Sequence, residues 1–169
     1  AGTEDGYFNR PVGISAGSLG RIYVLEDINS RVQVFSRVPT YDLNADGKPE
    51  IVVANNGHAS GTTVSVFPNN SVPGGIDLEA RFELAAGRQP VFVAITDVDG
   101  DGNPDVLATS HLSYEMSVMR NLGAGGVFGP ASFAPRVNFA TGTTPHSIIT
   151  ADLDADGRPD VIVANNGGN

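Results

Sequence analysis

The chain of 169 residues contains no cysteine, so neither disulfides nor thiolate metal sites can stabilise its fold. No stretch approaches the roughly 20 apolar residues that a membrane-spanning helix needs, and we expect no membrane span. No window shows a helical period with capping signals at its ends. No cluster of basic residues is present to neutralise phosphates, and this absence argues against a nucleic-acid partner.

Short apolar runs and turn residues make up most of what is present. Hydrophobic residues account for 40% of the chain, which is adequate for a globular core despite 21 glycines and 11 prolines. Those glycines and prolines separate short β-branched runs such as Ile51–Ala54 and Val161–Ala164. Many short strands joined by tight turns are typical of a soluble all-β protein.

Most of the negative charge lies in three nine-residue loops that begin at Asp42, Asp97 and Asp152, 55 residues apart. Each loop has oxygen-bearing side chains at positions one, three, five and nine, glycine at six and proline at eight. The loops hold eleven of the nineteen acidic residues, while the net charge of the chain is −9. An acidic surface coat does not require fixed spacing, so this pattern indicates a specific role for the carboxylates.

The spacing within each loop suits a hard cation. Calcium binds six to eight oxygens in irregular geometry, whereas magnesium prefers a strict octahedron and retained waters. Glycine at position six permits the chain reversal, which turns the main-chain carbonyl of position seven toward the ion. Two ionised carboxylates about 4 Å apart repel by roughly 4 kcal/mol at an effective dielectric near 20. We therefore expect up to three structural Ca²⁺ ions whose binding is coupled to folding.

The loops begin as an EF-hand does but do not end as one. Position twelve of an EF-hand carries a bidentate glutamate, whereas the corresponding residues here are Val53, Ala108 and Val163. The flanking segments have the pattern of strands, not of helices. The sequence therefore excludes an EF-hand.

One structural unit recurs from about residue 40. A strand leads into an acidic loop, a β-branched strand leaves it, and an alternating strand and a Gly/Pro-rich connector follow. The sequence predicts strands at 21–25, 31–35, 51–54, 63–67, 91–95, 106–109, 116–120, 146–150 and 161–164. Propellers close with about four to eight blades, and about three units are present here. Because the last unit is truncated, we expect its missing strands to come from a longer chain or a neighbouring subunit.

The loop pattern D-x-[DN]-x-D-G-x-x-[DE], followed by a β-branched strand, resembles the calcium loop of FG-GAP/VCBS repeats of integrin α-like propellers. The resemblance covers about 37–169 and also rests on Gly126-Val127-Phe128 and the lead-in Pro145–Asp152. It implies all-β propeller-type blades of four antiparallel strands in an incomplete propeller or repeat array. The calcium ligands that it implies are Asp42, Asn44, Asp46, Lys48 (carbonyl) and Glu50; Asp97, Asp99, Asp101, Asn103 (carbonyl) and Asp105; and Asp152, Asp154, Asp156, Arg158 (carbonyl) and Asp160.

The first loop departs most from this pattern, since Asn44 lowers its charge and Glu50 lengthens its last arm. We expect it to bind calcium most weakly, and we expect the strand at 37–41 to be shortened.

Residues 6–35 resemble an NHL repeat, another type of propeller blade. The resemblance rests on Pro11-x-Gly13-Ile14, Ile22–Val24 and Asn29–Phe35, although Leu25-Glu26 replaces the usual Ala-Asp. The predicted organisation is an NHL-like segment at 1–36, FG-GAP/VCBS-like repeats at 37–90 and 91–145, and a truncated repeat at 146–169.

No residues form a catalytic signature, and we expect no enzymatic activity. His58, His111 and His146 are scattered, and no nucleophile motif accompanies them. Weak calcium sites fill where the free ion is near millimolar, which favours an extracellular location. The predicted function is a calcium-stabilised module for adhesion, scaffolding or self-assembly through unpaired blade edges. The alternative is a lectin-like glycan-binding propeller, or the propeller of a larger carbohydrate-active enzyme, to which Asn55-Asn56-Gly57 would contribute amide groups.

Overall fold

The computed structural model describes residues 11–17, 21–26, 31–35, 41–123 and 125–167 of the chain. Within these ranges the secondary structure consists of β-strands and two short 3₁₀ turns, with no α-helix. In this part of the chain no helix is long and apolar enough to cross a membrane. The predicted all-β class is confirmed.

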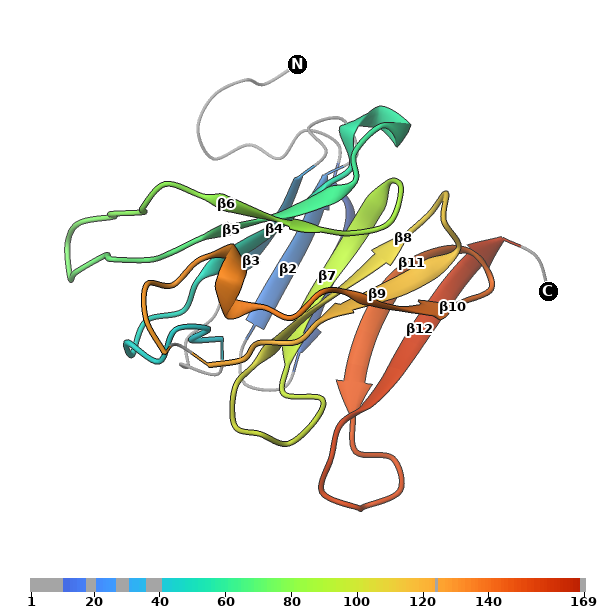
Figure 1. Cartoon of the computed structure of the whole chain (residues 1–169). Coiled ribbons are helices and arrows are strands. Elements are labelled where there is room, and N and C mark those ends of the chain that lie inside the picture. Colours follow the sequence, from blue (N-terminus) through green and yellow to red (C-terminus); the bar gives the residue numbers. More distant parts are fainter. Residues whose placement is uncertain (1–10, 18–20, 27–30, 36–40, 124, 168–169) are drawn as a thin grey trace.

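The strands form four antiparallel sheets (Figure 1), each built from neighbours in sequence. Their bounds are β1 Pro11–Gly17, β2 Arg21–Glu26 and β3 Arg31–Phe35; β4 Ile51–Asn55, β5 Thr63–Phe67 and β6 Phe82–Ala85; β7 Pro90–Thr96, β8 Asp105–Ser110, β9 Glu115–Met119 and β10 Val137–Ala140; β11 Thr143–Ala151 and β12 Asp160–Gly167. The 3₁₀ turns are η1 Gly57–Ala59 and η2 Pro130–Ser132. Such sheets, joined by short connections, are typical of propeller blades in an open array.

The predicted strands are confirmed within two or three residues at each end. The sheet β7–β10 is a four-stranded antiparallel blade, as expected. The sequence reasoning missed β1, β6 and β10. The last two are four residues long and contain polar side chains, so their alternation is too brief to stand out from the connectors. The lead-in at 37–41 lies outside the described residues apart from Tyr41.

The pairing registers make the first two repeats directly comparable. Ile51 pairs with Phe67, and Val106, 55 residues after Ile51, pairs with Met119. The hairpin of the second repeat is shorter, so β5 and β9 correspond with an offset of 52 residues. Further along, β6 and β10 pair with them through Phe82 and Val137, which restores the offset of 55.

The main core lies between the sheet β4–β6 and the sheet β7–β10. Alternate residues of β4 and β5 face it, and all six residues of β8 are buried because neighbouring layers cover both of its faces. The buried residues of this core are Tyr41, Leu43, Val52, Ala54, Val64, Val66, Leu84, Ala86, Val93, Ile95, Val106, Ala108, Met119 and Phe133. It holds the first two repeats together.

Three aromatic rings close this core at its outer end. Phe82 of β6 meets Phe128 of the next repeat's connector edge to face, with ring centroids 5.3 Å apart. Phe133 lies 6.2 Å from Phe82 and 6.0 Å from Phe128. These phenylalanines belong to the interface between the first two repeats. Such ring pairs stabilise beyond their buried area.

A further phenylalanine, Phe139, has 51% of its surface exposed. It lies in β10, on the side of the second repeat that faces the third. A smaller core there contains Leu107, Met116 and Ile148. The described part of the third repeat has only β11 and β12, so less apolar surface is available to cover this side.

A buried and a half-exposed phenylalanine should respond differently to replacement by alanine. Phe133→Ala should lower the free energy of unfolding by about 3 kcal/mol, because it removes a buried ring and leaves a cavity. Phe139→Ala should cost about 1 kcal/mol or less, because half of its ring is already in water. Urea unfolding followed by tyrosine fluorescence measures both. Equal losses would contradict the assignment of the core.

A polar network covers one face of each complete hairpin. In the first repeat, the Glu83 carboxylate of β6 accepts hydrogen bonds from Asn55, Ser65 and Arg81 at 2.7–2.9 Å. In the second repeat, position 83 corresponds to Asn138, and the carboxylate is Glu115 of β9 instead.

The Glu115 carboxylate of the second repeat makes the same kinds of contact as Glu83 of the first. Arg136 donates to Glu115 Oε1 at 3.1 Å and to Ser117 at 3.3 Å, while Ser117 donates to Asn138 at 3.0 Å. Each network therefore holds one carboxylate and one arginine, but the carboxylate stands on a different strand.

Candidate metal centres

The three acidic loops share one hydrogen-bond pattern. The carboxylate at position one accepts the backbone N–H groups of positions five and six, as Asp42 does from Asp46 and Gly47 at 2.9 and 2.6 Å. The side chain at position three accepts the N–H of position five, and that at position five accepts the N–H of position seven. These Asx-type turns fold the loop around its own oxygens. The loops of β7–β8 and β11–β12 project from the same end of their sheets (Figure 1).

Two positions in every loop have left-handed backbone. Position six is glycine in all three loops, with φ between 87° and 91°, as the sequence predicted. Position four is also left-handed, and there Ala45 and Ala155 have φ values of 61° and 62°, whereas the second loop has Gly100. A non-glycine residue in this region is unfavourable by about 1 kcal/mol. The sequence reasoning did not recognise this second reversal.

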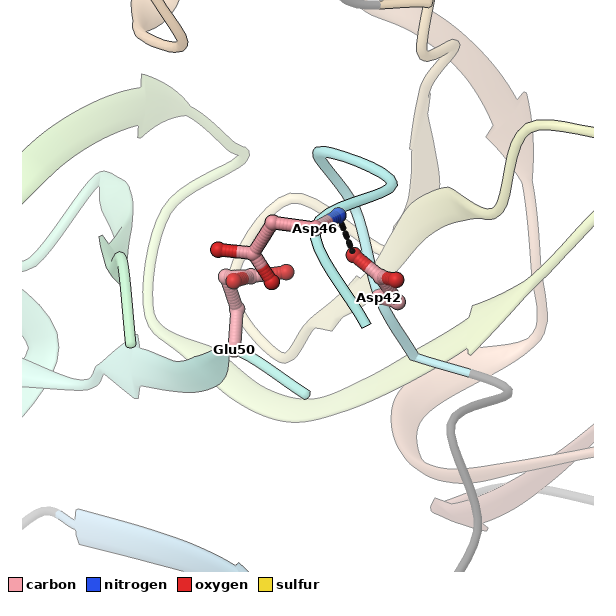
Figure 2. A group of neighbouring side chains, drawn as sticks. All are labelled: Asp42, Asp46 and Glu50. Atoms are coloured by element: carbon pink, nitrogen blue, oxygen red, sulfur yellow. Dashed lines mark hydrogen bonds between the residues drawn. The ribbon is translucent and has the colours of Figure 1, made fainter. Parts of the chain in front are cut away.

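Carboxylates from one loop converge in each case. Figure 2 shows Asp42, Asp46 and Glu50 around one point of the first loop. In each loop three carboxylates offer oxygens that all lie within 4.8 Å of one another. The three groups are Asp42, Asp46 and Glu50; Asp97, Asp99 and Asp101; and Asp152, Asp154 and Asp160.

The remaining predicted ligands lie outside these converging carboxylate groups. Asn44 Oδ1 accepts the backbone N–H of Asp46, so its oxygen faces the interior of the loop. Asp105 and Asp156 lie in the second and third loops but outside the converging groups. The main-chain carbonyls of Lys48, Asn103 and Arg158 stay predictions.

The carboxylate at position nine ties the loop end to its beginning. Glu50, Asp105 and Asp160 each accept the backbone N–H of position two, at 2.6, 2.9 and 2.9 Å. Glu50 is 5% exposed and Asp105 is fully buried, although both are acidic. A buried carboxylate needs compensation by hydrogen bonds or by a cation.

The two buried carboxylates are compensated differently. Asp105 Oδ1 accepts a second backbone N–H, from Asn121, at 2.8 Å. Glu50 Oε1 is buried, and no hydrogen-bond partner for it exists in the described residues. The pKa of Glu50 is raised from its ordinary value of 4.5 to about 7, chiefly by burial and in part by the neighbouring Asp46 and Asp42 carboxylates, while the backbone N–H groups of Leu43 and Asn69 oppose the shift. Burial likewise raises the pKa of Asp105. An unpaired buried oxygen beside two further carboxylates fits a divalent cation.

The second loop forms an ion pair with an arginine side chain of the same repeat. Arg120, at the end of β9, donates to Asp99 Oδ2 at 3.2 Å in an exposed ion pair. The corresponding residue of the first repeat is Pro68, which carries no charge. The loops therefore differ in their local charge as well as in their ligands.

Two asparagines that the sequence reasoning missed support the loops. Asn69 and Asn121 occupy the same position, two residues after β5 and β9. Asn69 donates its amide to the Pro49 carbonyl at 2.8 Å, and Asn121 donates to the Pro104 carbonyl at 3.1 Å. Each side-chain oxygen also accepts a backbone N–H two residues on. The signal available in the sequence was an asparagine following each alternating strand.

Asn121 also joins two repeats. Its amide donates to the Leu43 carbonyl in the first loop at 2.8 Å, and the residue is fully buried. Its backbone N–H is the donor to Asp105. One side chain therefore connects the first and second loops.

His111 is partly buried. Its ring centroid lies 5.5 Å from that of His146, across the boundary between the second and third repeats. Burial, followed by the charge of His146, lowers the pKa of His111. The described structure gives neither histidine a place near the converging carboxylates.

Glu50→Gln should stabilise the calcium-free protein at pH 8 by about 2 kcal/mol. The folded pKa of Glu50 lies above the unfolded value, so the folded state binds the proton more tightly and loses stability as pH rises from about 4.5 to 7. Glutamine does not ionise, so the variant and the parent chain should converge near pH 4. Thermal melts in EDTA at both pH values measure this difference.

In the presence of calcium the parent chain should be more stable than the Glu50→Gln variant, because glutamine is a poorer ligand than carboxylate. A parent chain that is the more stable of the two at pH 8 in EDTA would contradict the effect of burial on Glu50.

Together the stacked antiparallel sheets and their recurring loops define a β-repeat protein with propeller-type blades. The chain belongs to the FG-GAP-like repeat family, whose description matches residues 42–108 and 97–163. The NHL repeat description matches residues 8–35. Both matches agree with the predicted repeats and their order. A comparison with curated proteins found no match.

Proposed function

We propose that the chain is a non-enzymatic, calcium-stabilised extracellular repeat module for adhesion, scaffolding or self-assembly. The observation that carries the calcium part is the buried Glu50 oxygen, which has no hydrogen-bond partner in the described structure and lies beside Asp42 and Asp46. All the side chains concerned are hard oxygen donors, which suit Ca²⁺.

Calcium would act in each loop as a clamp between strands. The second loop connects β7 to β8 and the third connects β11 to β12, so an ion held there fixes the start of a hairpin. It also neutralises carboxylates that otherwise repel one another. Sites of this kind stabilise a fold and need no reaction chemistry.

Calcium titration by isothermal calorimetry tests the proposal. We expect up to three sites, with the first loop the weakest, and we expect Asp101→Asn and Asp156→Asn each to remove or weaken one of them. Asp77→Asn is the matched control, because Asp77 is an exposed acidic residue outside the loops. Absence of calcium binding at millimolar concentration, or equal effects of the control, would overturn the proposal.

The alternative of glycan binding has less support. The Asn55 amide donates to Thr63, Ser65 and Glu83 within its own blade, at 2.7–2.9 Å. These contacts use the donor that a sugar hydroxyl would need. They favour a structural role for this asparagine.

A further inference from the structure

Two histidines meet at the boundary between the second and third repeats. His111 directly follows β8, and His146 lies near the start of β11, which packs beside β8 (Figure 1). Their ring centroids are 5.5 Å apart, and the ring planes are inclined at 56°. Each of these strands has an acidic loop at one end and its histidine near the other. The histidine pair is therefore separated from the acidic loops by most of the length of a strand.

The backbone holds both rings at this boundary. The N–H of His111 donates to the Gln89 carbonyl at 2.9 Å, which ties the end of β8 to the connector before β7. His146 is the extra residue of a β-bulge, at the register shift between Pro145 and Ser147. Bulges redirect a side chain out of the normal alternation of a strand. Both imidazoles are thus carried by backbone that is fixed in the fold.

The His111 imidazole has a polar atom without a partner. Its Nε2 is buried, and the described residues provide no hydrogen-bond partner for it. Buried polar side-chain atoms normally bind the protein, an ordered water or a ligand. Burial, followed by the charge of His146, lowers the pKa of His111. Because metal ions bind the neutral ring, this shift keeps His111 available as a ligand near neutral pH.

The separation of the two rings suits one shared metal ion. Zinc–nitrogen bonds of about 2.1 Å and a tetrahedral angle place the centroids of two coordinating imidazoles roughly 5 Å apart. The observed centroid distance of 5.5 Å is close to this value. The Nε2 of His111 makes no hydrogen bond to His146, so a direct contact between the rings does not account for their spacing.

The boundary between the first and second repeats has the same backbone but different side chains. By the 55-residue repeat, His111 and His146 correspond to Asn56 and Val91. Val91 also lies at a register shift of its strand and is 6% exposed. The bulge therefore belongs to both repeats, and an apolar residue is sufficient to pack there. The two imidazoles add ligand chemistry that packing does not require.

We propose that His111 and His146 together bind one divalent transition-metal ion of the zinc class, with water at the remaining coordination positions. Imidazole nitrogens suit Zn²⁺, Cu²⁺ and Ni²⁺, whereas the oxygen donors of the acidic loops suit Ca²⁺. The two kinds of site therefore select different ions. An ion held by the histidines joins the end of β8 to the start of β11 and fixes the third repeat against the second. This inference goes beyond the proposed calcium-stabilised module and does not depend on it.

Zinc titration of the full chain by isothermal calorimetry, in excess calcium at about pH 7.5, tests the site. We expect one saturable zinc site whose affinity falls at least about tenfold in His111→Gln and in His146→Gln, because each variant loses a ligand. His58→Gln is the matched control, since His58 is the third histidine of the chain and is exposed in η1. It should bind zinc as the parent chain does. Absence of saturable zinc binding, or equal affinity in the parent chain and both ligand variants, would overturn the inference.

Nuclear magnetic resonance of the imidazole nitrogens tests the same site in the unsubstituted chain. It remains decisive if a substitution at the repeat boundary prevents folding. One equivalent of zinc should shift the ring nitrogen signals of His111 and His146 and leave those of His58 in place. Unchanged signals from the pair, or shifts confined to His58, would contradict the site.

The zinc and calcium titrations fail separately. A chain that binds calcium but shows no zinc-dependent change at the histidines contradicts the histidine site alone. Zinc binding at the histidines of a chain that binds no calcium contradicts the calcium proposal alone.

Discussion

Saturating calcium should raise the free energy of unfolding by about 8 kcal/mol relative to EDTA. A ligand present at 100 times its dissociation constant stabilises the folded state by about 2.7 kcal/mol per site, and the chain has three loops. The effect arises because the unfolded loops do not hold their carboxylates within 4.8 Å of one another. Urea unfolding in calcium and in EDTA measures the difference.

Substitutions in single loops show how much each loop contributes to this calcium-dependent stability. Asp101→Asn and Asp156→Asn should each remove about one third of the calcium-dependent stability, and a loss at one loop should leave the others in place. Magnesium at the same concentration should restore little, because it requires octahedral geometry. Identical unfolding curves in calcium and EDTA would contradict the prediction.

Asn121→Leu should destabilise the chain by about 4 kcal/mol, with or without calcium. The substitution leaves the Leu43 and Pro104 carbonyls and the Gly123 N–H without their partner, and unpaired buried groups cost about 1–3 kcal/mol each. Leucine has a similar volume, so the loss reports hydrogen bonding more than packing. Urea unfolding in EDTA measures it free of metal effects.

Asn69→Leu is the matched control for Asn121→Leu. Asn69 stands at the corresponding place in the first repeat, is only partly buried and donates to one carbonyl, that of Pro49. Its replacement should cost about 1–2 kcal/mol. Equal losses at both positions would show that the contact of Asn121 with Leu43 contributes nothing.

Local chemistry explains why much of the fold could be predicted from the sequence. Strands such as β5 and β7 carry alternating or β-branched residues between loops that contain glycine and proline, so their bounds follow from neighbours in the chain. The 55-residue spacing of the loops then fixed the repeat. The convergence of Asp42, Asp46 and Glu50 also follows from spacing within nine residues.

What the sequence did not predict depends on contacts between distant residues. Asn121 and Leu43 are 78 residues apart, and nothing local in either segment indicates their hydrogen bond. The burial of Glu50, and therefore its raised pKa, requires the packing of the core around the first loop. The exposure of Phe139 depends on which strands cover β10, which its own alternation cannot reveal.

The different positions of the network carboxylates limit how the two repeats can recombine. A hybrid that inserts β9 before β6 places Glu115 and Glu83 beside the same serine, with one arginine for two negative charges. The reverse hybrid, with β5 before β10, leaves Arg136 facing Thr63 and Asn138 and no carboxylate. A hybrid of the two repeats should therefore fold only when the third and fourth strands of a blade are exchanged together. That strand pair is the smallest segment that can be exchanged between repeats.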